Sequence, residues 1–192
     1  PLTYVQNITT PYIIFHGGND RRTGFVQGEM MYRSLKVLGR PVEYVVHPGA
    51  VVVIGLLDDG RVLLERQFRY PVGMVMTEFP AGKLDAGEQP LFCAQRELLE
   101  ETGYTAREWA YAGPMHLAIG YSTEVIHVFF ARGLTAGERQ LDADEFLDVC
   151  SMTPAELIDG VRTGQVTDAK TLSCCLWLQN VQSGAWTLDW KV

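Results

Sequence analysis

The chain has 192 residues, of which 47% are hydrophobic, 20% are charged and 10% are aromatic, and its formal net charge is −7. This is the composition of a globular protein, which excludes disordered and collagen-like chains, and the length suits one domain with or without a small appendage. The acidic balance argues against nucleic acid as a partner, because a phosphate backbone needs a basic protein face.

Three features of the sequence bear on cellular location. The longest apolar run, residues 50–57, is far shorter than the ~18–20 residues that span a bilayer, so we expect no transmembrane helix and no membrane partner. The first residues lack both a secretion signal and an initiator Met, so we expect a chain trimmed from a longer one. The four cysteines have no CxxC spacing, which favours a reducing, cytoplasmic compartment.

Residues 1–47 predict a short strand-helix-strand segment. The apolar run at 11–15 ends at a turn sequence, residues 16–20. Apolar residues with nearly helical spacing over 25–38 predict a helix, and residues 42–46 predict a second strand. Such a unit buries only one face well and needs a partner sheet.

Residues 48–192 predict a larger α/β unit. Two apolar runs, 50–54 and 61–64, flank Asp58-Asp59-Gly60, and Asp-Gly between such runs is a strong hairpin signal. A helix is expected from Pro90 to about Thr102, because Pro opens it and Gly follows its end. The other expected elements are strands at 74–79, 109–117, 125–131 and 148–152, and helices at 153–164 and 169–181.

Acidic side chains gather on one face of the expected helix at 90–102. At about 100° per residue, Glu97, Glu100 and Glu101 fall within an arc of roughly 100°. Like charges three and four residues apart destabilise a helix by about 0.2–0.5 kcal/mol per pair unless a cation binds them. Mg²⁺ or Mn²⁺ fits best, because these ions prefer oxygen ligands and accept phosphate oxygens. Gly82, upstream, leaves room for the backbone to approach a metal or a phosphate.

An alternative interpretation of Glu-x-x-Glu-Glu is a solvated acidic helix face, in which Arg96 pairs with nearby carboxylates. The whole pattern from Gly82 to Tyr104 decides between the two. It fixes seven polar or Gly positions, and at ~7% per residue a chance match is on the order of one in 10⁸ per starting point. The pattern resembles the Nudix box, G-x5-E-x7-R-E-U-x-E-E-x-G-U, at every fixed position, with Tyr104 aromatic where the last U is usually aliphatic.

This resemblance implies an α/β fold, a Nudix α/β/α sandwich with a mixed sheet, and Mg²⁺-dependent hydrolysis of a nucleoside diphosphate linked to another moiety. The implied metal ligands are the side chains of Glu97 and Glu101, that of Glu100 directly or through water, and the carbonyl of Ala81. Arg96 and Glu88 would mainly orient the box. Within it, Glu100 and Arg96 are the residues assigned to catalysis.

Further segments narrow the resemblance to the ADP-ribose pyrophosphatase group of the Nudix family. They are residues 47–50, 66–73, 78–82, 121–124 and 168–171, and the likeness as a whole covers about residues 46–182. In that group the Arg at the position of Arg69 contacts the substrate, so Arg69 and Gly82 are the expected substrate-binding residues. A surface ion pair is the alternative for Arg69.

The same group has a catalytic Glu in an acidic loop before the last strand, which acts as base or as transient metal ligand. Residues 141–146 match that loop by position. We expect Glu145 in this role, with Asp144 and Asp142 as rivals and a solvated turn as the alternative.

The resemblance implies that ADP-ribose is hydrolysed to AMP and ribose 5-phosphate. Metal ions would neutralise the pyrophosphate and lower the pKa of a bound water, which attacks one phosphorus in line. One alternative is a GDP-mannose or other nucleoside-diphosphate-sugar pyrophosphatase. Another is a domain that binds a nucleotide sugar without cleaving it, although the intact carboxylates weigh against this.

Residues 10–23 and 26–46 resemble the C-terminal part of a prolyl-oligopeptidase-like α/β-hydrolase, with Asp20 at the position of the triad acid. A serine hydrolase nevertheless fails, because the sequence has no Gly-x-Ser-x-Gly elbow to expose a nucleophile. We therefore expect two parts, an atypical segment at 1–47 and a Nudix domain at 48–192. The segment stands in place of the N-terminal strands that ADP-ribose pyrophosphatases use in dimerisation and substrate enclosure, which leaves a homodimer open.

Overall fold

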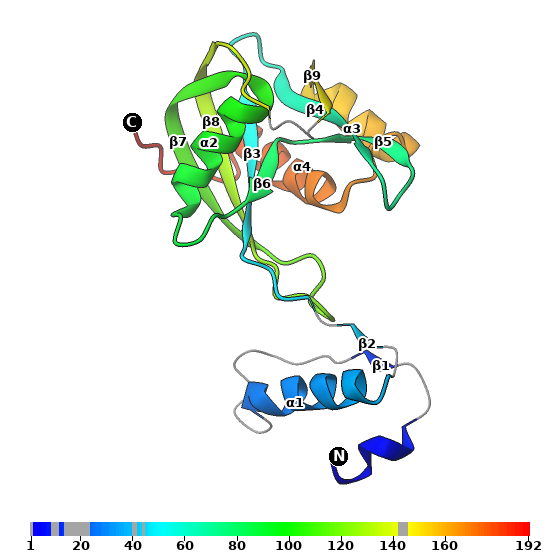
Figure 1. Cartoon of the computed structure of the whole chain (residues 1–192). Coiled ribbons are helices and arrows are strands. Elements are labelled where there is room, and N and C mark those ends of the chain that lie inside the picture. Colours follow the sequence, from blue (N-terminus) through cyan, green and yellow to red (C-terminus); the bar gives the residue numbers. More distant parts are fainter. Residues whose placement is uncertain (1, 9–11, 14–23, 40–41, 44, 142–145) are drawn as a thin grey trace. The chain divides into compact units, whose positions relative to one another are not determined.

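The computed structural model divides the chain into two compact units (Figure 1). The residues that it describes are 2–8, 12–13, 24–39, 42–43, 45–141 and 146–192. The smaller unit consists of residues 1–48 and 116–124, and the larger unit of residues 49–115 and 125–192. In the described stretches, no helix is both long and apolar enough to cross a membrane.

The larger unit is built on a seven-stranded mixed sheet. Its strands are β3 (Ala50–Leu56), β4 (Val62–Arg69), β5 (Met74–Glu78), β6 (Ala81–Lys83), β7 (Tyr104–Met115), β8 (Ile126–Ala136) and β9 (Leu147–Met152). The strand order is β5-β4-β3-β8-β7, with β6 paired to β3 and β9 paired to β4. β3 and β8 run parallel, and the other strand pairs are antiparallel.

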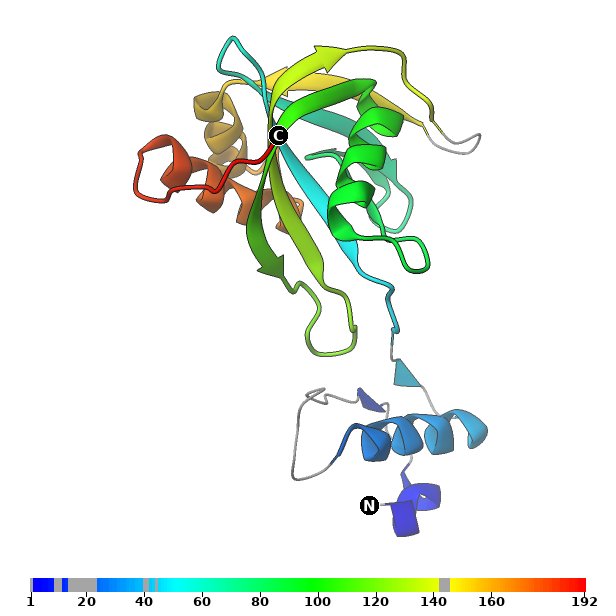
Figure 2. The same cartoon turned by 90° about the vertical axis from the view of Figure 1, so that its left-hand side faces the viewer.

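Helices cover both faces of this sheet (Figure 2). They are α2 (Pro90–Thr102), α3 (Pro154–Thr163) and α4 (Ala169–Gln182). Because successive side chains of a strand point to opposite faces, Val51 of β3 joins Leu98 of α2 in one core cluster. Val52 joins Leu157 of α3 and Leu178 of α4 in the other cluster. The expected α/β/α sandwich with a mixed sheet is therefore confirmed.

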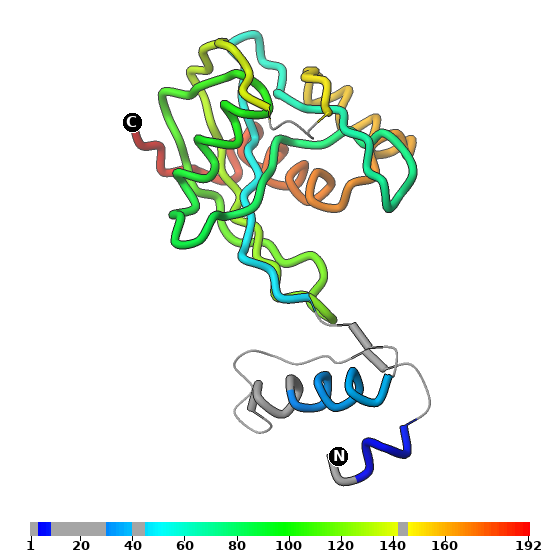
Figure 3. The backbone as a smooth tube through the Cα atoms, in the orientation of Figure 1, coloured from blue at the N-terminus to red at the C-terminus, as the bar shows by residue number. Residues whose placement is uncertain are grey.

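Among its described residues, the smaller unit has a short 3-10 helix, η1, an α-helix and two short strands (Figure 1), and Figure 3 traces its backbone. Its elements are η1 (Leu2–Asn7), β1 (Tyr12–Ile13), α1 (Gly24–Val37) and β2 (Val42–Glu43). β1 and β2 pair in parallel and lie within the strands expected at 11–15 and 42–46. Leu35 of α1 is fully buried and forms a small core with Met31.

Residues 116–124 contact the stretch before β3 within the smaller unit. The N–H of Val45 donates to the Tyr121 carbonyl at 2.7 Å, and the N–H of Thr123 donates to the Val45 carbonyl at 3.0 Å. His47 lies 3.6 Å from a carboxylate oxygen of Glu124. Backbone hydrogen bonds therefore join two segments that are far apart in sequence.

The helix boundaries follow the expected caps. α2 begins at Pro90 and is capped after Thr102 by Gly103, which has a φ of 76° and whose N–H donates to the Leu99 carbonyl at 2.8 Å. α3 begins with a complete capping box between Thr153 and Glu156. Local sequence signals are thus sufficient to place the helices of the larger unit.

Strands β4, β7 and β8 are longer than the apolar pattern indicates, and β4 continues from the expected run at 61–64 to Arg69. β7 begins at Tyr104 rather than at the expected Trp109, and β8 continues to Ala136. Charged residues obscured the extensions of β7 and β8, because Glu108 and Arg132 sit opposite each other in these two strands and form an ion pair. Such a cross-strand pair lets charged side chains occupy a sheet.

Candidate active site

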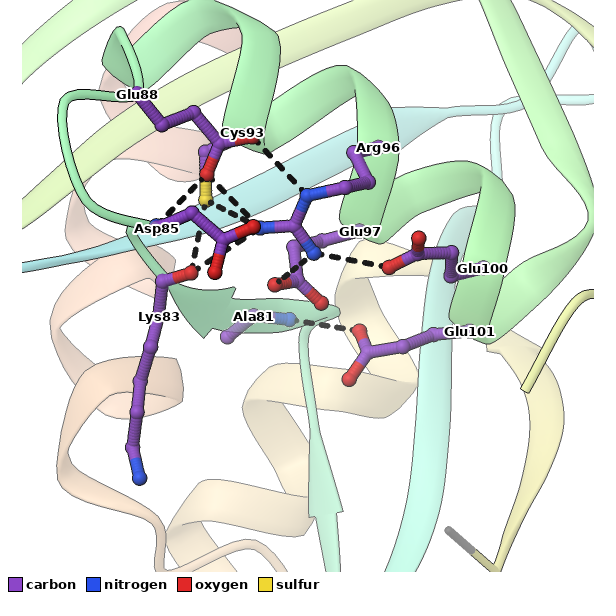
Figure 4. A network of polar contacts seen from close by, with 9 residues as sticks. All are labelled: Ala81, Lys83, Asp85, Glu88, Cys93, Arg96, Glu97, Glu100 and Glu101. Carbon is purple, nitrogen blue, oxygen red and sulfur yellow. Dashed lines mark hydrogen bonds and ion pairs between the residues drawn. The ribbon is translucent and has the colours of Figure 1, made fainter. Parts of the chain in front are cut away.

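The three glutamates of α2 lie near the end of the helix, over strand β6 (Figure 4). The buried side chains Ala94 and Leu98 hold the helix on the sheet and set the direction of the carboxylates. Side-chain exposure is 12% for Glu97 and 34% for Glu100, and Glu101 is only 2% exposed. These values argue against a freely solvated acidic face.

Strand β6 passes α2 at Gly82, where there is no room for a side chain. A Cβ atom at Gly82 would lie 1.8 Å from Cδ of Glu97 and 2.0 Å from its Oε1. Glycine therefore lets the carboxylate reach the strand. The close approach expected at Gly82 is, in this structure, the approach of a side chain of the box.

Glu101 is held beside the same strand. The N–H of Ala81 donates to Oε2 of Glu101 at 3.0 Å (Figure 4). The strand and the helix are joined by the loop and turns of residues 84–89, and their packing brings these two positions together. The structure thus places Ala81 and Glu101, both expected metal ligands, next to each other.

Arg96 binds three carboxylates at once. Its Nε and Nη2 donate to Glu88 at 3.0 and 2.9 Å. Its Nη1 donates to Glu97 at 2.8 Å and to Glu100 at 2.9 Å. The hydrogen bonds to Arg96 lower the pKa of Glu88 to about 2, and the same contacts raise the pKa of Arg96. Arg96 therefore occupies a position from which it orients the box.

The oxygen atoms of the three glutamates and of the Ala81 carbonyl suit a hard divalent cation as ligands. In the described part of the chain, no three Asp, Glu, His or Cys side chains are gathered closely enough to hold a metal as they stand. Arg96 is hydrogen-bonded to Glu97 and Glu100, and the N–H of Ala81 is hydrogen-bonded to Glu101. The donors are nevertheless all oxygens, and one guanidinium faces three carboxylates, so negative charge is in excess.

These groups line one cavity of about 490 Å³. Ala81, Gly82, Arg96 and the three glutamates of α2 form part of its wall, and Arg69 of β4 joins them. Lys83 also lines the cavity, so that Arg69 and Lys83 are two positively charged side chains there besides Arg96. The structure thus brings together, in one cavity, every expected site residue that it describes.

Comparison with known proteins agrees with this geometry. Residues 46–173 match the NUDIX domain. The chain is 42% identical to the ADP-ribose pyrophosphatase of Bacillus subtilis (strain 168), over 71% of this chain and 75% of that protein. The chain belongs to the NUDIX domain family. The expectation of an enzyme of the Nudix hydrolase type is confirmed.

Two further relatives and a solved structure resemble this Nudix chain. The ADP-ribose pyrophosphatase of Mycobacterium tuberculosis (strain ATCC 25618 / H37Rv) is 33% identical, over 74% of this chain and 70% of that protein. The GDP-mannose pyrophosphatase of Cronobacter sakazakii (strain ATCC BAA-894) is 35% identical, over 70% of this chain and 73% of that protein. A crystal structure described as an ADP compounds hydrolase shares the fold, with a TM-score of 0.65 and 22% identity over 71% of this chain and 74% of that one.

The Nudix match begins at residue 46, so it does not bear on most of the smaller unit. The likeness of residues 10–23 and 26–46 to a prolyl-oligopeptidase-like fragment stays a prediction. The domain boundary expected between residues 47 and 48 stays a prediction as well.

Arg69 of the Nudix cavity is bound to a buried carboxylate. Its Nε and Nη2 each donate to Glu78 at 2.8 Å, and Glu78 is only 2% exposed. Lys170 of α4 donates to the same carboxylate and to Asp168 at 3.0 Å. Burial by itself raises the pKa of Glu78, but the hydrogen bonds from Arg69 and Lys170 bring that pKa below its usual value. Arg69, whose side chain is 39% exposed, is therefore bound to a buried carboxylate that Lys170 shares.

Sequence reasoning missed Glu65 on strand β4. This side chain is fully buried, neither of its carboxylate oxygens is hydrogen-bonded, and the carboxyl group of Glu101 lies beside it. Burial is the main reason that the pKa of Glu65 is raised to about 7. A signal was available, because Glu65 follows the buried Leu63 by two positions and therefore shares its face of the strand. The expected apolar run stops at Leu64, whereas strand β4 continues to Arg69.

The expected catalytic base lies outside the described residues. Glu145 and its rivals Asp142 and Asp144 all belong to residues 142–145, which are not among the residues that the structure describes. Their roles stay predictions.

Proposed function

We propose that this Nudix chain is a Mg²⁺-dependent pyrophosphatase that hydrolyses ADP-ribose to AMP and ribose 5-phosphate. The observation that carries the proposal is the single cavity that holds the three glutamates of α2, Ala81 and Arg69. Two relatives that are 42% and 33% identical carry the name ADP-ribose pyrophosphatase, which supports the choice of substrate.

The residues that would hold the metal are Glu97, Glu100 and Glu101 through their carboxylates and Ala81 through its carbonyl. Mn²⁺ suits the same oxygen donors as Mg²⁺. A cation bound there supplies charge neutralisation for the pyrophosphate and lowers the pKa of a water.

The chain's own side chains bind and orient the substrate. Arg69 offers five N–H donors, of which two contact Glu78, so the others can bind phosphate oxygens. The bond from Lys170 to Glu78 fixes the anchor of that arginine. Arg96 keeps the box carboxylates in place, and Glu145 takes the proton of the attacking water.

A GDP-mannose pyrophosphatase is the second candidate, favoured by the 35% identity to the Cronobacter sakazakii protein of that name. Both substrates are nucleoside diphosphate sugars, so the same carboxylates would serve cleavage of the same kind of bond. Binding without cleavage is disfavoured, because all three glutamates of α2 line the cavity. The homodimer and the cytoplasmic location stay predictions.

Phosphorus NMR of the chain with Mg²⁺ and either ADP-ribose or GDP-mannose tests the proposal. We expect AMP and ribose 5-phosphate from ADP-ribose, at a higher rate than GDP-mannose is cleaved. Glu101→Gln should lose nearly all of the rate. Glu108→Gln, a matched change at an ion pair with Arg132 outside the cavity wall, should keep it.

Each outcome of this experiment has a distinct meaning. Cleavage of GDP-mannose alone would transfer the assignment to the second candidate. A Glu101→Gln variant as active as the wild type would contradict the role of the box. ADP-ribose and GDP-mannose that both remain intact would leave binding without cleavage as the function.

A further inference from the structure

Glu65 is a buried carboxylate whose oxygens meet no donor group and whose side chain lies within reach of the Glu101 carboxyl group. Its exposed fraction is 0%, and neither Oε1 nor Oε2 meets a donor. In the part of the chain that the structure describes, no other residue has such buried, unbonded side-chain oxygens. An ionised carboxylate in a protein interior is strongly unfavourable unless it is paired or coordinated, so its presence requires an explanation.

The groups around Glu65 compensate its charge only in part. Glu78 faces it across the β4–β5 pair, and Glu101 approaches it from α2. The nearby cations are Lys170 and Arg69; both donate to Glu78, and Lys170 also donates to Asp168. Among Glu65, Glu78 and Glu101, only Glu78 is hydrogen-bonded to these cations.

Glu101 is the side chain through which Glu65 can act. Glu101 lines the cavity, whereas Glu65 lies behind it and forms no part of the cavity wall. The N–H of Ala81 compensates one oxygen of Glu101. Two adjacent carboxylates repel each other, and a cation bound by the outer one relieves that repulsion for both.

We propose that Glu65 is a positioning residue of the divalent-cation site, which adds negative charge behind Glu101 and so strengthens the binding of Mg²⁺ or Mn²⁺ by that carboxylate. This inference rests on the metal requirement of the proposed function and extends the site by a residue outside the Nudix box. Without a cation, the two carboxylates destabilise the fold. With a cation, their combined charge favours the bound state.

The proposal predicts effects of opposite sign on two properties of Glu65→Gln. Glutamine keeps the shape of the side chain and removes its charge, so Mn²⁺ should bind roughly 10- to 100-fold more weakly, as is typical when a residue behind a metal ligand is changed. In EDTA the melting temperature should be equal to that of the wild type or higher, because the unpaired buried carboxylate is gone. A purely structural carboxylate would show the reverse, with a lower melting temperature and unchanged affinity.

Isothermal titration calorimetry with Mn²⁺ and melting curves in EDTA, both on the full chain, test this proposal. The variants are Glu65→Gln, Glu65→Val, Glu101→Gln and the surface control Glu108→Gln. Valine is included because it removes both the charge and the polar group, so a fold that does not accept the buried amide still gives a result. Glu108→Gln should bind Mn²⁺ as the wild type does.

The outcomes separate this inference from the proposed function. If the wild type binds Mn²⁺, Glu101→Gln does not, and both Glu65 variants bind as the wild type does, the inference is overturned and the metal site stands. If the wild type binds no Mn²⁺, the metal requirement and this inference both fail. Weaker binding together with an undiminished melting temperature would support the role of Glu65.

Discussion

Two groups of carboxylates in the larger unit differ in how their charge is compensated. They are the Arg96 network, which is Arg96 with Glu88, Glu97 and Glu100, and the interior pair, which is Glu65 with Glu101. In the network, a single guanidinium binds every carboxylate. In the interior pair, Glu101 accepts the N–H of Ala81, and Glu65 accepts no hydrogen bond.

This difference separates the geometry of the site from its affinity for a cation. The Arg96 network fixes where the carboxylates of α2 point, at partly exposed positions. The interior pair keeps negative charge where no side-chain cation is hydrogen-bonded to Glu65. A chain that compensated both groups would be more stable, but it would attract a cation less strongly.

The largest expected effect comes from Glu101→Gln, which removes the charge of the interior pair at the cavity wall. The rate of ADP-ribose hydrolysis with Mg²⁺ should fall by at least about 100-fold, because metal affinity is sensitive to the ligands and to the groups behind them. The fold should persist, since the glutamine oxygen still accepts the N–H of Ala81. A rate within a few-fold of the wild type would show that the charge of the interior pair is no more important for the cation than that of the Arg96 network.

Arg96→Met tests the network by leaving its three carboxylates without their cation. The free energy of unfolding, measured by urea denaturation, should fall by about 1–3 kcal/mol, with partial solvent exposure keeping the loss below that of a fully buried pair. Arg96→Lys should recover only part of this, because lysine lacks the planar fork that reaches several carboxylates. Full recovery by lysine would show that charge alone orients the box.

Gly82→Ala sharpens the comparison, because it moves one carboxylate of the network and leaves the interior pair in place. The new Cβ would overlap the carboxylate of Glu97, which is the flexible end of a side chain and can move aside. We therefore expect a small change in melting temperature but roughly tenfold weaker Mn²⁺ binding by calorimetry. Equal loss of stability and of binding would instead point to a displaced strand β6.

The smallest expected effect is a pH dependence of stability from Glu88. Its pKa is about 2 in the folded chain against an ordinary 4.5, chiefly because of Arg96, so its contribution is present above pH 4.5 and is lost as the pH falls toward 2. Urea midpoints of the wild type should fall across that window, and those of Glu88→Gln should fall less. Identical slopes for the two proteins would contradict the assigned cause.

The fold and the box were predictable because both depend on local signals. Continuous apolar runs placed the central strands, and Pro90 and Gly103 gave α2 the bounds that the structure shows. The helical spacing of Glu97 and Glu101 was enough to predict that they share a face, since a helix fixes the direction of its side chains. The resemblance to the Nudix box brought Gly82 into the same expected site.

The remaining features depend on contacts between segments that are distant in sequence. The anchor of Arg69 includes Lys170, which reaches Glu78 across 92 positions of the chain. The burial of Glu65 needed the full extent of strand β4, and its proximity to Glu101 needed the packing of α2 on the sheet. The first residues of β7 were not predicted as a strand because they include charged side chains, and the ion-pair partner of Glu108 lies in β8.

The measurement that tests the central claim most directly is a phosphorus NMR time course of the wild-type chain with ADP-ribose, run once with Mg²⁺ and once with EDTA. The account predicts AMP and ribose 5-phosphate with Mg²⁺ and intact ADP-ribose with EDTA. Intact ADP-ribose in the presence of Mg²⁺, or the same rate in EDTA, would contradict it.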